Sequence, residues 1–174
     1  MSHRAREIQP SGIRKFFDLL GDMKDVVSLT VGQPDFVTPW HIRAAAIESL
    51  EAGKTYYTSN AGLPRLREEI ARYLSRRFAL SYDPATELLV TVGGSEAIDL
   101  AVRGVIDPGD EVIIPTPSFV CYAPLVTLAG GIPVEVATRE ADAFKLTPEA
   151  LRSALTPKTK LVILPFPNNP TGAI

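Results

Sequence analysis

The sequence predicts an α/β domain with a largely parallel sheet, and two observations support this prediction. Short apolar segments rich in β-branched residues alternate along the chain with segments whose apolar residues recur at helical spacing. Clusters of glycine and proline separate the two kinds of segment. Strands that alternate with helices pair in parallel and are covered by those helices. The predicted strands span residues 87–92, 111–115, 132–137 and 160–165.

The composition excludes several classes of protein. The 174 residues are 45% hydrophobic and 22% charged with a net charge of −2, which suits a globular domain and argues against general nucleic-acid binding. No apolar run is long enough to span a bilayer, and the polar N-terminus lacks a signal peptide. The single cysteine, Cys121, excludes an internal disulfide and fits a reducing compartment, so we expect a cytoplasmic protein. His3 and His41 give no zinc-ligand spacing.

The first part of the chain combines an arm, short elements and two longer helices. Gly32 opens a loop over residues 32–36, because glycine and proline prevent regular structure there. Thr38 as N-cap and Pro39 at the first helical position predict a helix over residues 40–52. The other predicted segments are an arm at 1–12, a helical pattern at 13–20, a strand at 26–31, a loop at 54–63 and a helix at 64–78.

Residues 87–105 have the pattern of a strand, a glycine turn and a helix. Gly93 and Gly94 allow a sharp turn and a close approach of the backbone to a ligand. Ser95 is the predicted N-cap of the helix, whose first N–H groups can bind a phosphate. The helix dipole contributes at most about 2 kcal/mol, so binding needs several N–H donors and a hydroxyl. An ordinary turn that binds nothing fits this stretch equally well.

Three loops follow predicted strands, at residues 93–95, 115–119 and 166–171. Parallel sheets bind ligands at the carboxyl ends of their strands, so these loops could converge on one small molecule. A phosphate at the first loop, an aromatic plate at the second and an amide donor at the third would describe a flat phosphorylated cofactor. Between the loops we predict helices at 124–129 and within 144–155, the latter with Thr147 as N-cap and Pro148 at its first position.

Taken together, these motifs resemble the class I/II, fold-type I, pyridoxal-phosphate aminotransferases. The Asn-Pro-Thr-Gly sequence after a buried strand is the most specific of them. The resemblance covers nearly the whole chain and implies the first half of a fold-type I large domain, with a mainly parallel sheet flanked by helices. The matching pieces, in family order, are SLTVGQPDF at 28–36, YYTSNAGLPRLREEI at 56–70, VTVGGSEAIDLA at 90–101, DPGDEVIIPTPSFVCY at 107–122 and LPFPNNPTG at 164–172.

The resemblance implies a role for particular residues in binding pyridoxal 5′-phosphate. Gly94, Ser95 and Glu96 would hold the phosphate through backbone N–H groups and the Ser95 hydroxyl. Phe119 would stack on the pyridine ring, which is worth about 0.5–1.5 kcal/mol beyond burial. Asn169 would donate its side-chain amide to the ring hydroxyl oxygen. Tyrosine or tryptophan is common in the family where this chain has Phe119, so a polar group is lost there.

Two further residues take implied roles outside these loops. Tyr57 would reach the cofactor phosphate of a neighbouring subunit, which implies a homodimer with shared active sites. Gly32 would line the substrate pocket near the α-carboxylate. Cys121, Tyr122 and Asn168 match no required role, so we interpret them as packing residues or as support for the ligand-binding residues. The expected domains are an N-terminal arm and part of the small domain at 1–38, and an incomplete large domain at 39–174.

The family's catalytic groups follow the Asn-Pro-Thr-Gly motif and are not expected in this chain. They are a Schiff-base lysine, an aspartate against the pyridine nitrogen and an arginine that pairs with the substrate carboxylate. Lys158 and Lys160 do not match the family's lysine motif. We therefore expect the chain alone to be inactive and to need the remaining C-terminal polypeptide. Strands of that polypeptide would lie between 87–92 and the other three.

Three alternative functions remain open. The same cofactor loops would serve another fold-type I enzyme, such as a carbon–sulfur β-lyase. A regulatory protein with an aminotransferase-like sensor domain would carry an N-terminal helix-turn-helix, for which residues 1–11 leave no room. A non-catalytic aminotransferase-like fragment is the third. The first expectation is transfer of an amino group between an L-amino acid and a 2-oxo acid.

Overall fold

The computed structural model describes residues 2–8, 27, 32 and 34–174. These residues fall into two compact units, one within Met1–Ser11 and Val92–Ile174 and the other within Gly12–Thr91. The helix predicted at 13–20 lies outside the described residues, and so does the strand predicted at 26–31 apart from Val27. We describe each unit by itself.

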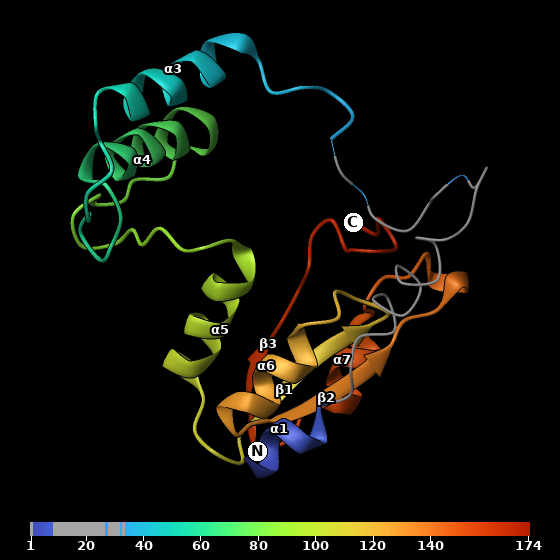
Figure 1. Cartoon of the computed structure of the whole chain (residues 1–174). Coiled ribbons are helices and arrows are strands. Elements are labelled where there is room, and N and C mark those ends of the chain that lie inside the picture. Colours follow the sequence, from blue (N-terminus) through green and yellow to red (C-terminus); the bar gives the residue numbers. More distant parts are fainter. Residues whose placement is uncertain (1, 9–26, 28–31, 33) are drawn as a thin grey trace. The chain divides into compact units, whose positions relative to one another are not determined.

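The larger unit contains a parallel three-stranded sheet in the order β2-β1-β3 (Figure 1). The strands are β1 (Glu111–Thr116), β2 (Ile132–Ala137) and β3 (Thr159–Val162), and β1 pairs in parallel with both neighbours. Three predicted strands are therefore confirmed. β3 is shorter than predicted, although Ile163 still donates its N–H to the Ile113 carbonyl at 2.9 Å. Pro165 has no N–H with which to continue the ladder.

Two helices cover opposite faces of this sheet. Helix α6 (Tyr122–Ala129) connects β1 to β2 and packs on both strands, and α7 (Pro148–Ala154) connects β2 to β3 and packs on β2. The chain moves in opposite directions across the sheet in these two connections. Right-handed crossovers consequently place α6 in front of the sheet and α7 behind it in Figure 1. The predicted cap of α7 is confirmed, since Thr147 Oγ1 accepts from the Ala150 N–H at 3.2 Å.

The core of this unit lies between the sheet, α6 and α5 (Gly94–Val105). β1 is the central strand of the sheet, and both of its faces are covered. Its residues therefore form a continuous buried run, without the alternation of buried and exposed residues that a half-exposed strand has. Gly131, at the turn from α6 into β2, allows the closest approach: a Cβ there would lie 2.6 Å from Ile106 Cδ1. The buried cluster consists of Val102, Ile106, Val112, Ile114 and Val126.

Two short helices complete the larger unit. Helix α1 (His3–Glu7) packs on α6, and the Arg4 guanidinium reaches the Leu128 carbonyl at 3.5 Å near the end of α6. A cation is favourable there, because the C-terminal end of a helix carries partial negative charge. The 3₁₀ helix η1 (Glu140–Asp142), which the sequence did not predict, lies between β2 and α7.

The strand predicted at 87–92 is wrong, because these residues form no strand in the structure. A strand requires a partner for its backbone groups, and the sheet order includes no strand beside this segment. Val90 instead donates its N–H to the Ala61 carbonyl at 3.1 Å. Leu89 and Val92 are 56% and 91% exposed, so the segment's apolar residues are not covered in this chain.

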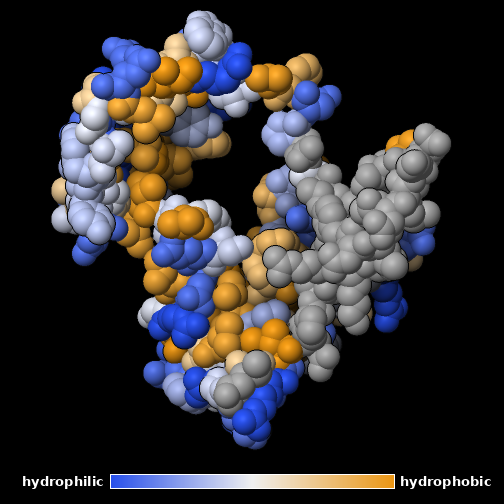
Figure 2. All heavy atoms as spheres, viewed as in Figure 1, coloured by the Kyte–Doolittle hydropathy of each residue, from blue (hydrophilic) through white to orange (hydrophobic). Residues whose placement is uncertain are grey.

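The smaller unit contains α3 (Trp40–Glu51) and α4 (Pro64–Phe78), which confirm the two helices predicted there. Pro39 is the N-cap of α3 in place of the predicted Thr38, because its ψ of 142° lies outside the helical region. Pro64 holds the first position of α4, as predicted. Arg67 is buried on α4 and donates to the Ala85 carbonyl at 3.0 Å, which ties the following loop to the helix. Figure 2 shows hydrophobic side chains, in orange, on the surface of this unit. Its exposed large side chains include Trp40, Leu50 and Tyr57.

Candidate functional site

The first candidate loop leads into α5. Gly93, with a φ of +82°, is the N-cap, and the helix begins at Gly94. The prediction that Ser95 is the N-cap is wrong by two positions, because only glycine adopts the conformation at residue 93 without strain. No side chain caps this helix, so the Ser95 hydroxyl is not used for capping. It lies 3.9 Å from the Cys121 sulfur.

The two glycines at the start of α5 border open space. A Cβ built on Gly93 or Gly94 would meet no atom within 4 Å. The first N–H groups of an α-helix have no partner inside the helix, which favours an anion at this position. Glu96 is the only acidic residue in the first turn, and its carboxylate accepts from the Val92 N–H on the preceding segment. Its negative charge is thus held by a backbone donor, in the manner of a capping box.

The second candidate loop follows β1. The Phe119 and Tyr122 rings meet edge to face, with 5.8 Å between their centroids and 83° between their planes. The Tyr122 N–H donates to the Phe119 carbonyl at 3.3 Å, which fixes the turn into α6. Burial raises the pKa of the Tyr122 phenol, with a smaller effect of the same sign from Cys121. This aromatic pair is therefore uncharged and half-buried beside the sheet.

Cys121 lies between the first and second loops. Burial raises the pKa of its thiol above the ordinary value, and the hydrogen bond with Ser95 opposes that shift more weakly. The thiol is therefore neutral at physiological pH. A neutral thiol next to Ser95 adds no negative charge where a phosphate would have to bind.

The third candidate loop follows β3 and is organised around Asn168, which is 8% exposed. The Asn168 N–H donates to the Ala173 carbonyl at 2.9 Å, and the Gly172 N–H donates to the Asn168 carbonyl at 2.8 Å. The Asn168 side-chain amide donates to the Pro117 carbonyl on the second loop at 2.9 Å. Asn169, the next residue, is exposed.

Contacts between side chains and backbone thus join the three loops. Ser95 meets Cys121, and Asn168 reaches Pro117, so the loops after β1 and β3 and the start of α5 are connected within one unit. Cys121 and Asn168, which the sequence analysis interprets as packing residues or as support for the ligand-binding residues, form these connections. For the connection to Pro117, the signal in the sequence was Asn168 itself, which directly precedes the Asn-Pro-Thr-Gly motif. Tyr57 and Gly32 belong to the other unit, where both are exposed, and their implied roles remain predictions.

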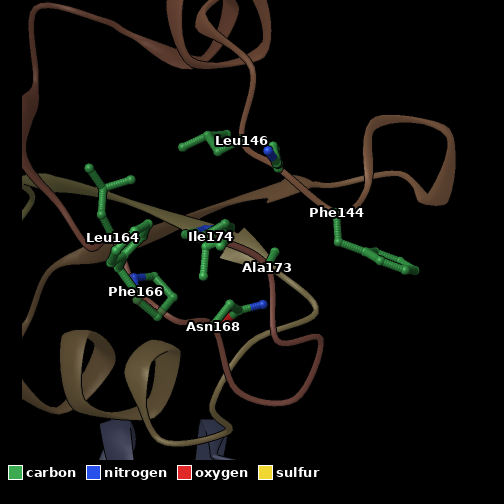
Figure 3. A pocket seen from close by; sticks show the side chains of 10 residues that line it. Phe144, Leu146, Leu164, Phe166, Asn168, Ala173 and Ile174 are labelled. Carbon is green, nitrogen blue, oxygen red and sulfur yellow. The ribbon is translucent and has the colours of Figure 1, made fainter.

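A cavity of about 270 Å³ opens beside the third loop (Figure 3). Its walls are mainly apolar, and Asn168 and Ile174 lie among the side chains that line it. Among the described residues that line it, Lys145 is the one that carries a charge. Among the described residues, no group of three or more histidine, cysteine, aspartate or glutamate side chains is placed to hold a metal ion. The described part of the chain also contains no helix with the length and hydrophobicity needed to cross a membrane.

Fold and loops together define an α/β unit whose three connected loops combine a helix N-terminus, an aromatic ring and a buried amide. The chain belongs to the aminotransferase class I and II family, whose model matches residues 24–174. The fold-type I prediction is confirmed, as solved aminotransferases share this architecture. Aspartate aminotransferase of Thermus thermophilus, in a single-mutant form, superposes with a TM-score of 0.89 at 43% identity, and covers 99% of this chain and 46% of its own.

Curated relatives give the same family. A Bacillus subtilis protein named "Putative aminotransferase YugH" is 57% identical over 174 residues, which is 100% of this chain and 45% of that protein. The aspartate aminotransferase of Pyrococcus abyssi is 48% identical, again over 100% of this chain and 45% of the relative. The chain therefore spans about half the length of the relatives it matches.

Proposed function

We propose that the full-length protein containing this chain is a pyridoxal-phosphate-dependent aminotransferase acting on an L-amino acid and a 2-oxo acid. The observation that carries the proposal is the family match over residues 24–174, together with the connected loops at the ends of β1, β3 and the start of α5. Relatives named for aspartate and for aromatic amino acids show that this family match does not select one donor. We therefore propose L-amino acids and 2-oxo acids as a class and name no single amino donor.

The residues present fit the phosphate and the ring of this cofactor. The N–H groups of Gly94, Ser95 and Glu96 would bind the phosphate, and the Ser95 hydroxyl would add a donor. Phe119 would cover one face of the ring, with its orientation held by Tyr122. Asn169 would donate to the ring hydroxyl oxygen. When bound, the cofactor supplies an electron-withdrawing ring that stabilises negative charge at the substrate Cα.

The proposal also includes the partners of the chain: its substrates, a second copy and the remaining polypeptide. Gly32 would line the substrate pocket, and Tyr57 would reach the phosphate site of a second copy, which makes a homodimer with shared sites. No residue of this chain is proposed as catalytic, so the isolated chain would be inactive until the rest of the polypeptide is supplied. We propose a cytoplasmic location, supported by the one free cysteine.

The test is a transamination assay on the full-length protein with added pyridoxal phosphate, a panel of L-amino acids and 2-oxoglutarate. Ser95→Ala is expected to weaken cofactor binding about tenfold or more, because it removes a hydroxyl donor to a charged group. Ser153→Ala is the matched control, since Ser153 is exposed on α7 and its Oγ donates only within that helix, to the Glu149 carbonyl. A full-length protein that neither binds the cofactor nor transaminates would overturn the proposal.

A further inference from the structure

The side chain of Asn168 connects the two loops that carry the proposed ring-binding residues. Its Nδ2 group donates to the Pro117 carbonyl at 2.9 Å and to Thr171 Oγ1 at 2.8 Å. Pro117 stands two positions before Phe119, and Asn168 stands directly before Asn169. The bond to Pro117 links the loop after β1 to the loop after β3.

The orientation of this amide is determined by its partners. Both Nδ2 protons are used, and rotating the amide would place Oδ1 against the Pro117 carbonyl, where two acceptors would face each other. The bond is also partly buried, and a hydrogen bond shielded from water is electrostatically stronger than the same bond in water. Oδ1, by contrast, is buried with no partner among the described residues. Asn168 therefore acts in this link as a hydrogen-bond donor, through Nδ2.

We propose that Asn168 is a positioning residue for the cofactor: by donating to Pro117 it holds Phe119 and Asn169 in place for binding to one ring. This inference rests on the proposed function. Ligand-binding groups must be held within about 0.5 Å of the productive geometry by supporting contacts, and each of these two groups lies on a loop. Asn168 itself does not touch the cofactor.

The first test compares two variants of the full-length protein by cofactor titration. Asn168→Ala removes the link between the loops and is expected to raise the Kd for pyridoxal phosphate about tenfold. Thr171→Val is a near-isosteric control that removes the two hydrogen bonds to Thr171 Oγ1 within the third loop and keeps the bond to Pro117. Its Kd is expected to stay within about threefold of wild type. Equal losses in the two variants would show that the link to Pro117 is not the important contact.

The second test replaces Asn168 with its charged isostere and uses pH as the readout. In Asn168→Asp a carboxylate would face the Pro117 carbonyl, whereas the protonated acid can donate an O–H to it. Burial raises the pKa of such a carboxyl group, so the change falls between about pH 5 and 8. The ratio of the variant's Kd to that of wild type is expected to fall as pH is lowered, while the Thr171→Val ratio stays constant. A residue with a purely structural role would not produce this difference.

The outcomes separate this inference from the proposed function. A wild-type protein that binds no pyridoxal phosphate refutes the proposed function and the inference with it. The inference alone is refuted if the wild-type protein binds pyridoxal phosphate, Asn168→Ala has the same Kd, and the ratio of the Asn168→Asp Kd to the wild-type Kd does not change with pH. If Asn168→Ala does not fold, the Asn168→Asp titration decides by itself.

Discussion

Gly93, Ser95 and Cys121 show how the conformation of one residue affects the contacts of another. Because Gly93 takes the N-cap position, the Ser95 hydroxyl is directed to Cys121 and does not cap its own helix. The thiol stays protonated because burial disfavours its charged form. A serine hydroxyl, a neutral thiol and the N–H groups of a helix thus meet at one point of the surface.

The raised pKa of Cys121 predicts slow alkylation. The thiolate is the reactive form, so the rate with iodoacetamide in the full-length protein should reach half its maximum at a higher pH than for free cysteine. The midpoint measures the pKa separately from access to the sulfur, and peptide mass spectrometry gives the rate at this residue. A midpoint at or below that of free cysteine would contradict the burial of the thiol.

Among the described elements, the turn from α6 into β2 is tightly packed against the core. Gly130 ends α6 with a φ of +93°, and Gly131 then brings the backbone against the core. A Cβ at residue 131 would lie 3.0 Å from Val126 Cγ1 and 3.2 Å from the Asp110 carbonyl oxygen. The side chains can shift, but the backbone carbonyl has less freedom, so the sheet and α6 depend on a glycine here.

Two glycine substitutions, one in this turn and one inside α5, should have opposite effects on stability. Gly131→Ala should destabilise the full-length protein by about 1–3 kcal/mol, because it overpacks the core. Gly104→Ala is the control: residue 104 lies inside α5, a Cβ there meets nothing within 4 Å, and alanine should stabilise the helix by up to about 1 kcal/mol. Hydrogen exchange of the α5 and α6 amides would measure both effects. Equal protection in the two variants would contradict the packing described.

For the molecule as a whole, three strongly exposed apolar residues of the larger unit lie after the end of β3. Leu164, Phe166 and Ile174 are 64%, 77% and 67% exposed, and β3 is an edge strand. Long edges with apolar residues promote association between chains. The relatives that this chain matches are more than twice its length, so further polypeptide is available to cover such surfaces in them.

The 174-residue chain is therefore expected to associate when it is produced alone. Size-exclusion chromatography should give oligomers or aggregates for it and a defined species for the full-length protein, and transamination should be found only in the latter. A monomeric chain with cooperative melting would contradict this expectation.

Much of the fold could be predicted from the sequence because its signals are local. Thr147-Pro148 correctly predicted the start of α7, and the apolar runs around Ile113 and Val134 correctly predicted strands of the parallel sheet. The segment 87–92 has an equally strong local pattern, but a strand also needs a neighbour, and no pattern within the segment supplies one. The helix start after Gly93 was misplaced because the sequence analysis considered the side-chain capping preference of Ser95, whereas the positive φ of Gly93 sets the boundary.

The candidate site was less predictable because its connections are non-local. The motifs indicated Ser95, Phe119 and Asn169, which the family resemblance assigned to the cofactor. The residues that join their loops, Cys121 and Asn168, match no family role, and their importance depends on partners that only the fold brings near. Sequence patterns thus indicated which loops matter, and the structure shows how those loops are held.

The bond from Asn168 to Pro117 joins positions 51 residues apart, so it has a consequence for the order of events during synthesis. Closing so long a segment is entropically unfavourable until β1 and β3 have paired around it. A nascent chain would acquire the ring-binding arrangement late, after its sheet is assembled. For the proposed cofactor, binding would then require completed folding, and half-folded copies would not bind it.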